Sequence, residues 1–142
     1  MQLTKFTDFG IRILFYLAQK PGQRVPVEEI TLAYDLSKHH VVKIIQRLAQ
    51  LGYVQTSRGK GGGVTLLADP RMVRMGTLVR ELEPTMKAVD CANPRCAILP
   101  ICRLKHWLND AVQAYIKELD QYSLADMMAG IEDPFPAQQR IL

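Results

Sequence analysis

Residues 38–51 constrain the fold most, because this segment is amphipathic at helical spacing and has a boundary signal at each end. Ser37 precedes it and is a favourable N-cap, while Gly52 follows it, where a helix favours a left-handed residue. One face is apolar and consists of Val41, Ile44, Ile45, Leu48 and Leu51. The opposite face carries no acid and consists of His39, Lys43, Gln46 and Gln50. The segment therefore predicts a helix with a buried apolar face and a polar, partly basic outer face.

Two helical segments precede this one. Apolar residues at helical spacing predict a first helix from Thr4 that stops at Pro21-Gly22. After Pro26, which suits a first helical position, the sequence VEEITLAY predicts a second, short helix that ends at Asp35-Leu36. Two short helices joined by a tight turn match a helix-turn-helix, whose second helix enters the major groove of DNA. A solvated helix in a small bundle is the alternative interpretation.

A glycine-rich turn follows the helices. The strand-like runs YVQTS and VTLLA flank the sequence RGKGGG at residues 58–63, which predicts a hairpin, or wing, with a basic tip. Arg58 and Lys60 offer charge to phosphates or to a narrow minor groove. A nucleotide-binding phosphate loop is disfavoured, because the order GxxxxGK[ST] is absent and no helix follows at once.

Charge is divided unevenly along the chain. Residues 1–80 carry twelve Lys and Arg against five Asp and Glu, whereas residues 81–142 carry six against nine. The amino-terminal part is therefore the candidate for binding a polyanion. The candidate DNA contacts are Ser37, Lys38, His39, His40, Lys43, Arg58 and Lys60. Because adjacent helical residues point about 100° apart, His39 and His40 are not expected to chelate one ion, and packing explains His40 as well as base contact does.

All three cysteines lie within residues 91–102, CANPRCAILPIC. Pro94 and Pro100 prevent a continuous helix there, and three cysteines cannot all pair within one chain. Zinc prefers four ligands in close CxxC pairs, while an iron-sulfur cluster also tolerates longer spacing and an unusual fourth donor. Unligated buried cysteines are the third interpretation. Oxygen and nitrogen donors to consider are Asp90, His106 and the distant Asp8.

The carboxyl-terminal part predicts a dimerisation helix. MGTLVRELEP is a short helical segment closed by Pro84. Beyond Cys102 an apolar seam runs through Leu104, Leu108, Ala111, Tyr115, Leu119 and Tyr122, and it is widened by Trp107, Val112 and Ile116. Since one small domain does not need so broad a stripe, we expect a symmetric homodimer. Ser123 and Asp126 then open a last short helix that ends by Gly130.

Other functional classes are not indicated. The sequence holds no run of 18 apolar residues and does not begin like a signal peptide, which predicts a cytoplasmic protein without a membrane segment. It also offers no nucleophile-base pair or carboxylate dyad in a plausible pocket, so we do not expect an enzyme.

Six stretches, taken in order, resemble one known family from Met1 to about Met128. They are MQLTKFTDFGIRIL, VVKIIQRLAQLGYV, RGKGGG, VRELEP, CRLK and ELDQYSLADM. Together with the three-cysteine loop, they resemble the nitric-oxide-sensing repressors among the iron-sulfur winged-helix regulators. The resemblance implies a homodimer that binds double-stranded DNA at an inverted repeat and carries one cluster per subunit.

The resemblance also implies the ligands. Cys91, Cys96 and Cys102 match the three cluster thiolates, and Asp8 stands where these repressors place a carboxylate from the other subunit. In the IscR branch of the family, the fourth ligand is a His three residues after the last Cys, with a 2Fe-2S cluster. That position is Lys105 here, and His106 is one residue later. A 4Fe-4S cluster is therefore expected, with 2Fe-2S as the alternative, although the first cysteine gap is shorter than in some relatives.

The expected protein is mainly α with a small β-hairpin wing. Its parts are a winged helix-turn-helix DNA-binding domain (1–80), a cluster-binding loop (81–102), a dimerisation helix with a short carboxyl-terminal helix (103–130) and a tail (131–142). We expect a transcriptional repressor that releases DNA when nitric oxide attacks its cluster. The alternatives are a regulator of the same fold that senses iron-sulfur supply or redox state, and a small iron-sulfur electron-transfer protein, which would need no groove-reading face.

Overall fold

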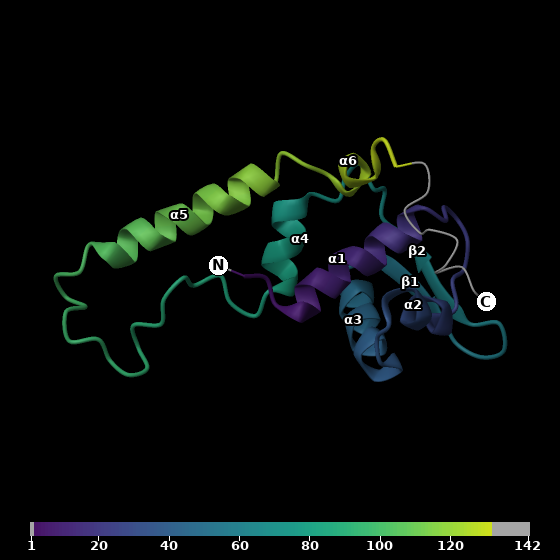
Figure 1. Cartoon of the computed structure of the whole chain (residues 1–142), viewed down its shortest axis with the longest axis horizontal. Helices are drawn as coiled ribbons and strands as arrows, with labels where there is room; N and C mark the ends of the chain where they lie inside the picture. The colour runs from purple at the N-terminus through teal and green to yellow at the C-terminus, as the bar shows by residue number, and fades with distance from the viewer. Residues whose placement is uncertain (1, 132–142) are drawn as a thin grey trace.

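The computed structural model describes residues 2–131, which form six helices and one two-stranded antiparallel sheet (Figure 1). The elements are α1 (Lys5–Ala18), α2 (Val27–Tyr34), α3 (Lys38–Gln50), β1 (Val54–Ser57), β2 (Gly63–Leu66), α4 (Met75–Leu82), α5 (Leu104–Leu119) and α6 (Leu124–Met128). Residues 132–142 of the predicted tail lie outside the described residues. In the described part, no helix combines the length and apolar character needed to cross a bilayer.

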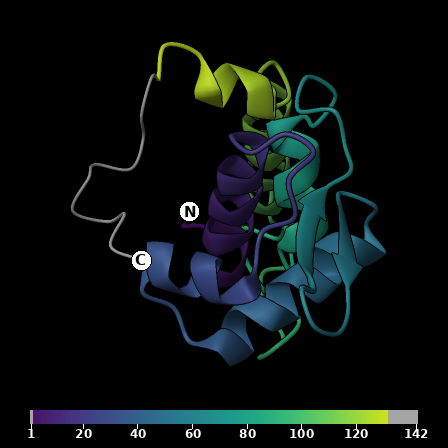
Figure 2. The ribbon, with the colours of Figure 1, turned by 90° about the vertical axis from the view of Figure 1, so that its right-hand side faces the viewer.

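Helix α1 is the centre of the core. The Thr4 hydroxyl caps its amino terminus by accepting a hydrogen bond from the Thr7 N–H, and Ile13, Leu14 and Leu17 are buried. Figures 1 and 2 show α2 and α3 on one side of α1 and α6 on the opposite side. The body of the molecule is therefore built around α1, which contacts α3, α4, α6 and β2.

The helix-turn-helix is formed as predicted. Asp35 closes α2 in the left-handed region, with φ of 50°, and the Ser37 hydroxyl caps α3 by accepting from the His40 N–H at 3.3 Å. Helix α2 begins at Val27, one residue later than the sequence suggested. The Val25 N–H and C=O both pair with Val64 at 2.8 Å, so the chain stays extended through Pro26, which becomes the residue before the helix.

The wing is the hairpin of β1 and β2, in which Val54 pairs with Leu66 and Ser57 pairs with Gly63. Its turn requires glycine. Gly59 and Gly61 adopt φ of 90° and 79°, and a Cβ on Gly62 would lie 2.5 Å from the Ser57 carbonyl oxygen. The turn therefore depends on glycine at positions 59, 61 and 62, where a side chain would strain the backbone or collide with it.

Helix α5 extends away from this body and carries the cysteine segment at its far end (Figure 1). The predicted apolar seam divides into two faces. Val112 and Ile116 are buried within the chain, whereas Leu104 and Trp107 are 55% and 61% exposed. The helix also ends at Leu119, so the last residue of the predicted seam lies in the turn that follows. Part of the width that suggested a dimer is thus explained by packing against the chain's own α4.

Candidate nucleic-acid interface and cysteine loop

The outer face of α3 is open to a partner. His39, Lys43, Gln46 and Gln50 are all exposed, while the same helix buries Val41, Ile44, Ile45 and Leu48. Such a face can place hydrogen-bond donors against base edges and charge against phosphates. The structure therefore brings together the four polar residues that the sequence placed on one line.

Lys38 already has a partner within the chain. Its ammonium group forms an ion pair with the Glu28 carboxylate of α2, and both side chains are more than 60% exposed. The hydrogen bond from Lys38 lowers the pKa of Glu28 below its ordinary value. A phosphate would have to compete with this carboxylate for Lys38, a contact that the sequence analysis did not foresee.

His40 lies beside α1. Its ring is half-buried and makes an edge contact with Phe9 at 5.7 Å between centroids and a tilted contact with Phe6 at 6.5 Å. These contacts agree with the packing interpretation that the sequence left open. The ring therefore packs the first turn of α3 against α1.

The wing tip presents Arg58 and Lys60, and both are exposed. A third cation that the sequence analysis missed stands next to them: the Arg24 guanidinium donates to the Gly61 carbonyl oxygen at 3.3 Å. Arg24 belongs to the segment between α1 and α2, so it ties the wing tip to the helix-turn-helix. The pairing of Val25 with Val64, a contact between residues distant in the sequence, brings Arg24 beside the wing.

The three cysteines are free thiols, and each is half-buried. Backbone turns fold the loop, with the Cys96 N–H donating to the Cys91 carbonyl at 3.1 Å and the Leu99 N–H donating to the Cys96 carbonyl at 3.2 Å. Within residues 2–131, no three His, Cys, Asp or Glu side chains gather closely enough to hold a metal ion. The donor chemistry fits an iron-sulfur cluster, because thiolates are its usual ligands, but the loop of the single chain does not assemble them.

Asp8 does not join the cysteines of its own chain. It lies on α1, in the body of the molecule, whereas the cysteine loop lies at the far end of α5 (Figure 1). Its carboxylate is paired with Arg12, whose Nε and a terminal nitrogen each lie 3.0 Å from one of its oxygens. For Asp8 to bind at a cysteine loop, its ion pair with Arg12 would therefore have to break.

The other candidate donors are accounted for locally. The Asp90 carboxylate accepts the backbone N–H groups of Ala92 at 2.8 Å and Asn93 at 3.3 Å, and these hydrogen bonds lower its pKa. His106 is exposed on the first turn of α5. A cavity of about 460 Å³ lies between this loop and α5, and of the three cysteines only Cys91 lines it.

The helix-turn-helix, the basic wing and the acid-free outer face of α3 define a winged-helix DNA-binding protein. The chain also matches the model of a known family, Rrf2, described as an iron-dependent transcriptional regulator, over residues 3–130. It therefore belongs to the Rrf2 family of transcriptional regulators. This membership confirms the expectation that the protein is not an enzyme, and the helices with their two-stranded hairpin confirm the predicted fold class.

Individual relatives agree with this assignment. The chain is 44% identical over 137 residues to the HTH-type transcriptional regulator NsrR of Bacillus subtilis (strain 168), covering 94% of each protein. Among solved structures it is similar to T. potens IscR, with 26% identity and a TM-score of 0.71 over 90% of this chain and 86% of that one. It also shares its fold with CymR, the global cysteine regulator of B. subtilis, at 23% identity and a TM-score of 0.68 over 89% and 95% of the two chains.

Proposed function

We propose that the chain is a homodimeric, cytoplasmic repressor that binds inverted-repeat DNA and releases it when nitric oxide reacts with an iron-sulfur cluster. One observation carries the proposal: three free thiols occupy one loop, and α5 joins that loop to the body of the molecule, where the outer face of α3 suits a DNA groove. The 44% identity to NsrR supports the same function. A reducing cytoplasm suits thiols that are not in disulfides.

The proposed ligands are Cys91, Cys96 and Cys102 of one subunit and Asp8 of the partner subunit. The position of α1 in the body supports a ligand from the partner, because Asp8 and the cysteine loop of one chain lie apart (Figure 1). A 4Fe-4S cluster is favoured over 2Fe-2S, because Lys105 occupies the position where the IscR branch has its His ligand. When bound, the cluster would supply an iron with a weak oxygen ligand that is open to attack by a small molecule.

Other residues of the chain would form the dimer, hold Asp8 and contact DNA. The exposed apolar side chains of α5 give a second copy a surface to cover, and a twofold axis would then present two α3 helices to successive major grooves. Arg12 would stabilise the Asp8 carboxylate whenever it is not a ligand. Arg58 and Lys60 on each wing would add phosphate or minor-groove contacts.

The test is release from an operator-like palindrome. Anaerobically prepared protein is exposed to nitric oxide, to oxygen or to an iron chelator, and DNA binding is measured by fluorescence anisotropy. We expect nitric oxide to weaken binding about a hundredfold, which corresponds to about 2.7 kcal/mol and lies within the usual range of allosteric coupling. Asp8→Ala should retain DNA binding but respond less to nitric oxide, and an unchanged response together with unchanged spectra would remove Asp8 from the site.

A second candidate is a regulator of the same fold that senses iron-sulfur supply or redox state. The description of its family as iron-dependent favours it. Release by chelation or by oxygen, with no response to nitric oxide beyond that caused by cluster loss, would select this function.

A further inference from the structure

Helix α4 begins without a side-chain cap of its own. Its N-cap residue is Arg74, which makes no capping hydrogen bond with its side chain. The end of α5 and the turn after it supply the missing acceptors: the Met75 N–H donates to the Tyr122 carbonyl at 3.0 Å, and the Thr77 N–H donates to the Asp120 carboxylate at 2.6 Å. Helix α4 therefore depends on α5 to satisfy its first backbone donors.

The two helices also approach each other closely at this place. A Cβ on Gly76 would lie 2.3 Å from the Ile116 carbonyl oxygen and 2.7 Å from the carboxyl group of Asp120, so only glycine fits there. The Thr77 hydroxyl adds a 3.1 Å hydrogen bond to the same Asp120 oxygen. Close backbone contact and a carboxylate cap together make this a tight connection.

The last turn of α4 is connected to the DNA-binding elements. The Arg47 guanidinium of α3 donates to the Glu81 carbonyl at 3.0 Å, and the Tyr53 hydroxyl, just before β1, donates to the Glu81 carboxylate at 2.5 Å. The Thr4 N–H, at the start of α1, donates to the Glu83 carboxylate at 2.7 Å. Because of these hydrogen bonds, a displacement of α4 would also displace α3, the start of the wing and the start of α1.

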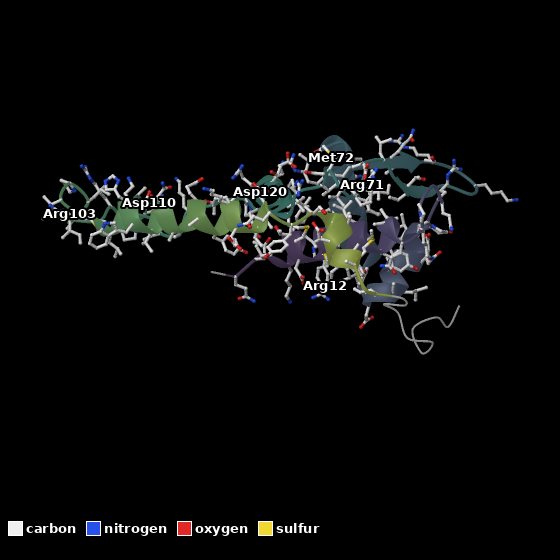
Figure 3. The ribbon with its side chains drawn as sticks, turned by 90° about the horizontal axis from the view of Figure 1, so that it is seen from above. Arg12, Arg71, Met72, Arg103, Asp110 and Asp120 are labelled. Atoms are coloured by element: carbon white, nitrogen blue, oxygen red, sulfur yellow. The ribbon has the colours of Figure 1, made fainter. Side chains whose placement is uncertain are left out.

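The cysteine loop joins the carboxyl end of α4 to the amino end of α5. These two helices are thus linked at one end by the loop and at the other by Asp120. Figure 3 shows Arg103 and Asp120 at opposite ends of α5. With 16 residues, this helix spans about 24 Å, so a small movement of the loop becomes a small rotation about the Asp120 end.

We propose that Asp120 and Gly76 form a fixed joint about which α5 pivots, and that this joint transmits the state of the cysteine loop to α3 through α4. The inference rests on the proposed function and names the residues that carry its regulation. Asp120 is a positioning residue, since its carboxylate is hydrogen-bonded to Thr77, which is neither a candidate DNA contact nor a proposed ligand of the cluster.

The experiment compares the DNA affinities of cluster-containing and cluster-free protein for three variants. Asp120→Ala removes the acceptor, and Asp120→Asn keeps an oxygen for the Thr77 N–H. Asp126→Ala is the control, because its carboxylate also caps a helix, but it accepts from the N–H and hydroxyl of Ser123, at 2.7 and 2.6 Å, and not from α4. Iron content and dimer mass are measured on every sample.

We expect the affinity ratio of the two states to fall from about a hundredfold to below about fivefold in Asp120→Ala, with iron content unchanged. Asp120→Asn and Asp126→Ala should keep a ratio within about threefold of the wild-type value. If Asp120→Ala keeps the wild-type affinity ratio, or if Asp120→Asn loses the ratio as completely as Asp120→Ala does, the joint alone is overturned. If the ratio measured for the wild-type protein itself is one, the proposed function and this inference are overturned together.

Amide hydrogen exchange on the wild-type dimer gives an independent test that needs no variant. The Met75 and Thr77 amides should keep the same protection with and without the cluster, while the loop at residues 84–103 should exchange faster without it. Loss of protection at Thr77 on cluster removal would show that the connection breaks instead of pivoting, which contradicts the proposal.

Discussion

The ion pair of Lys38 and Glu28 gives a sharp test of the proposed DNA interface. Glu28→Gln removes the carboxylate that competes with a phosphate for the Lys38 ammonium group. Because both side chains are more than 60% exposed, the pair contributes little to folding, and we expect thermal unfolding to be unchanged. DNA affinity should rise, since Lys38 no longer has to leave a partner and a negative charge is gone from the interface.

The size of the effect follows from counterion release. One added phosphate contact steepens the plot of log affinity against log salt by about 0.9, so the gain in affinity at about 50 mM salt should exceed the gain at about 200 mM by roughly 3.5-fold. Titrations of a palindromic duplex at four salt concentrations measure this slope. Glu118→Gln is the control, because it removes one negative charge from α5, away from α3. An equal change in both variants, or a slope unchanged in Glu28→Gln, would refute the placement of Lys38 at a phosphate.

Three further outcomes are expected. Lys60→Ala should make the same salt slope shallower by about 0.9, and an unchanged slope would remove the wing tip from the interface. Ile44→Ala should lower the free energy of unfolding by about 2 to 5 kcal/mol in urea, because Ile44 is fully buried, whereas Gln46→Ala on the outer face of α3 should cost less than about 0.5 kcal/mol. Burial raises the pKa of Glu29, but hydrogen bonds from Lys20 and Tyr16 outweigh burial, so the pKa lies below its ordinary value of 4.5. The ionised Glu29 therefore stabilises the fold above pH 4.5, and this contribution is lost as the pH falls through the lower, folded-state pKa. On acidification below about pH 4.5, Glu29→Gln should lose less stability than wild type, and parallel acid curves for the two proteins would contradict this.

Local signals in the sequence were sufficient for the amino-terminal fold. Ser37 caps α3, Asp35 and Gly52 adopt positive φ at the helix ends, and the glycines of the wing form the turn that the sequence predicts. These features depend on residues within a few positions of one another, and helix caps and turns are determined at that range. The pattern of alternating polar and apolar faces also placed the outer face of α3 correctly.

Contacts between distant residues could not be predicted. Nothing near Thr77 in the sequence indicates that its N–H is capped by Asp120, 43 positions later, and nothing near Gly61 indicates Arg24. The breadth of the α5 seam predicts a dimer, but periodicity does not distinguish burial against α4 from burial against a second copy. The position of Asp8 relative to the cysteine loop depends in the same way on how chains assemble.

The most direct test of the central claim is the metal content of the anaerobic protein, measured together with its DNA affinity. Wild-type protein purified without oxygen should absorb in the visible range and contain iron and acid-labile sulfide in equal amounts, about four of each per subunit for a 4Fe-4S cluster. Replacing Cys91, Cys96 and Cys102 by Ser should abolish the colour and change the affinity for the palindromic duplex. Colourless, iron-poor wild-type protein whose DNA affinity does not change with the triple replacement would contradict the account.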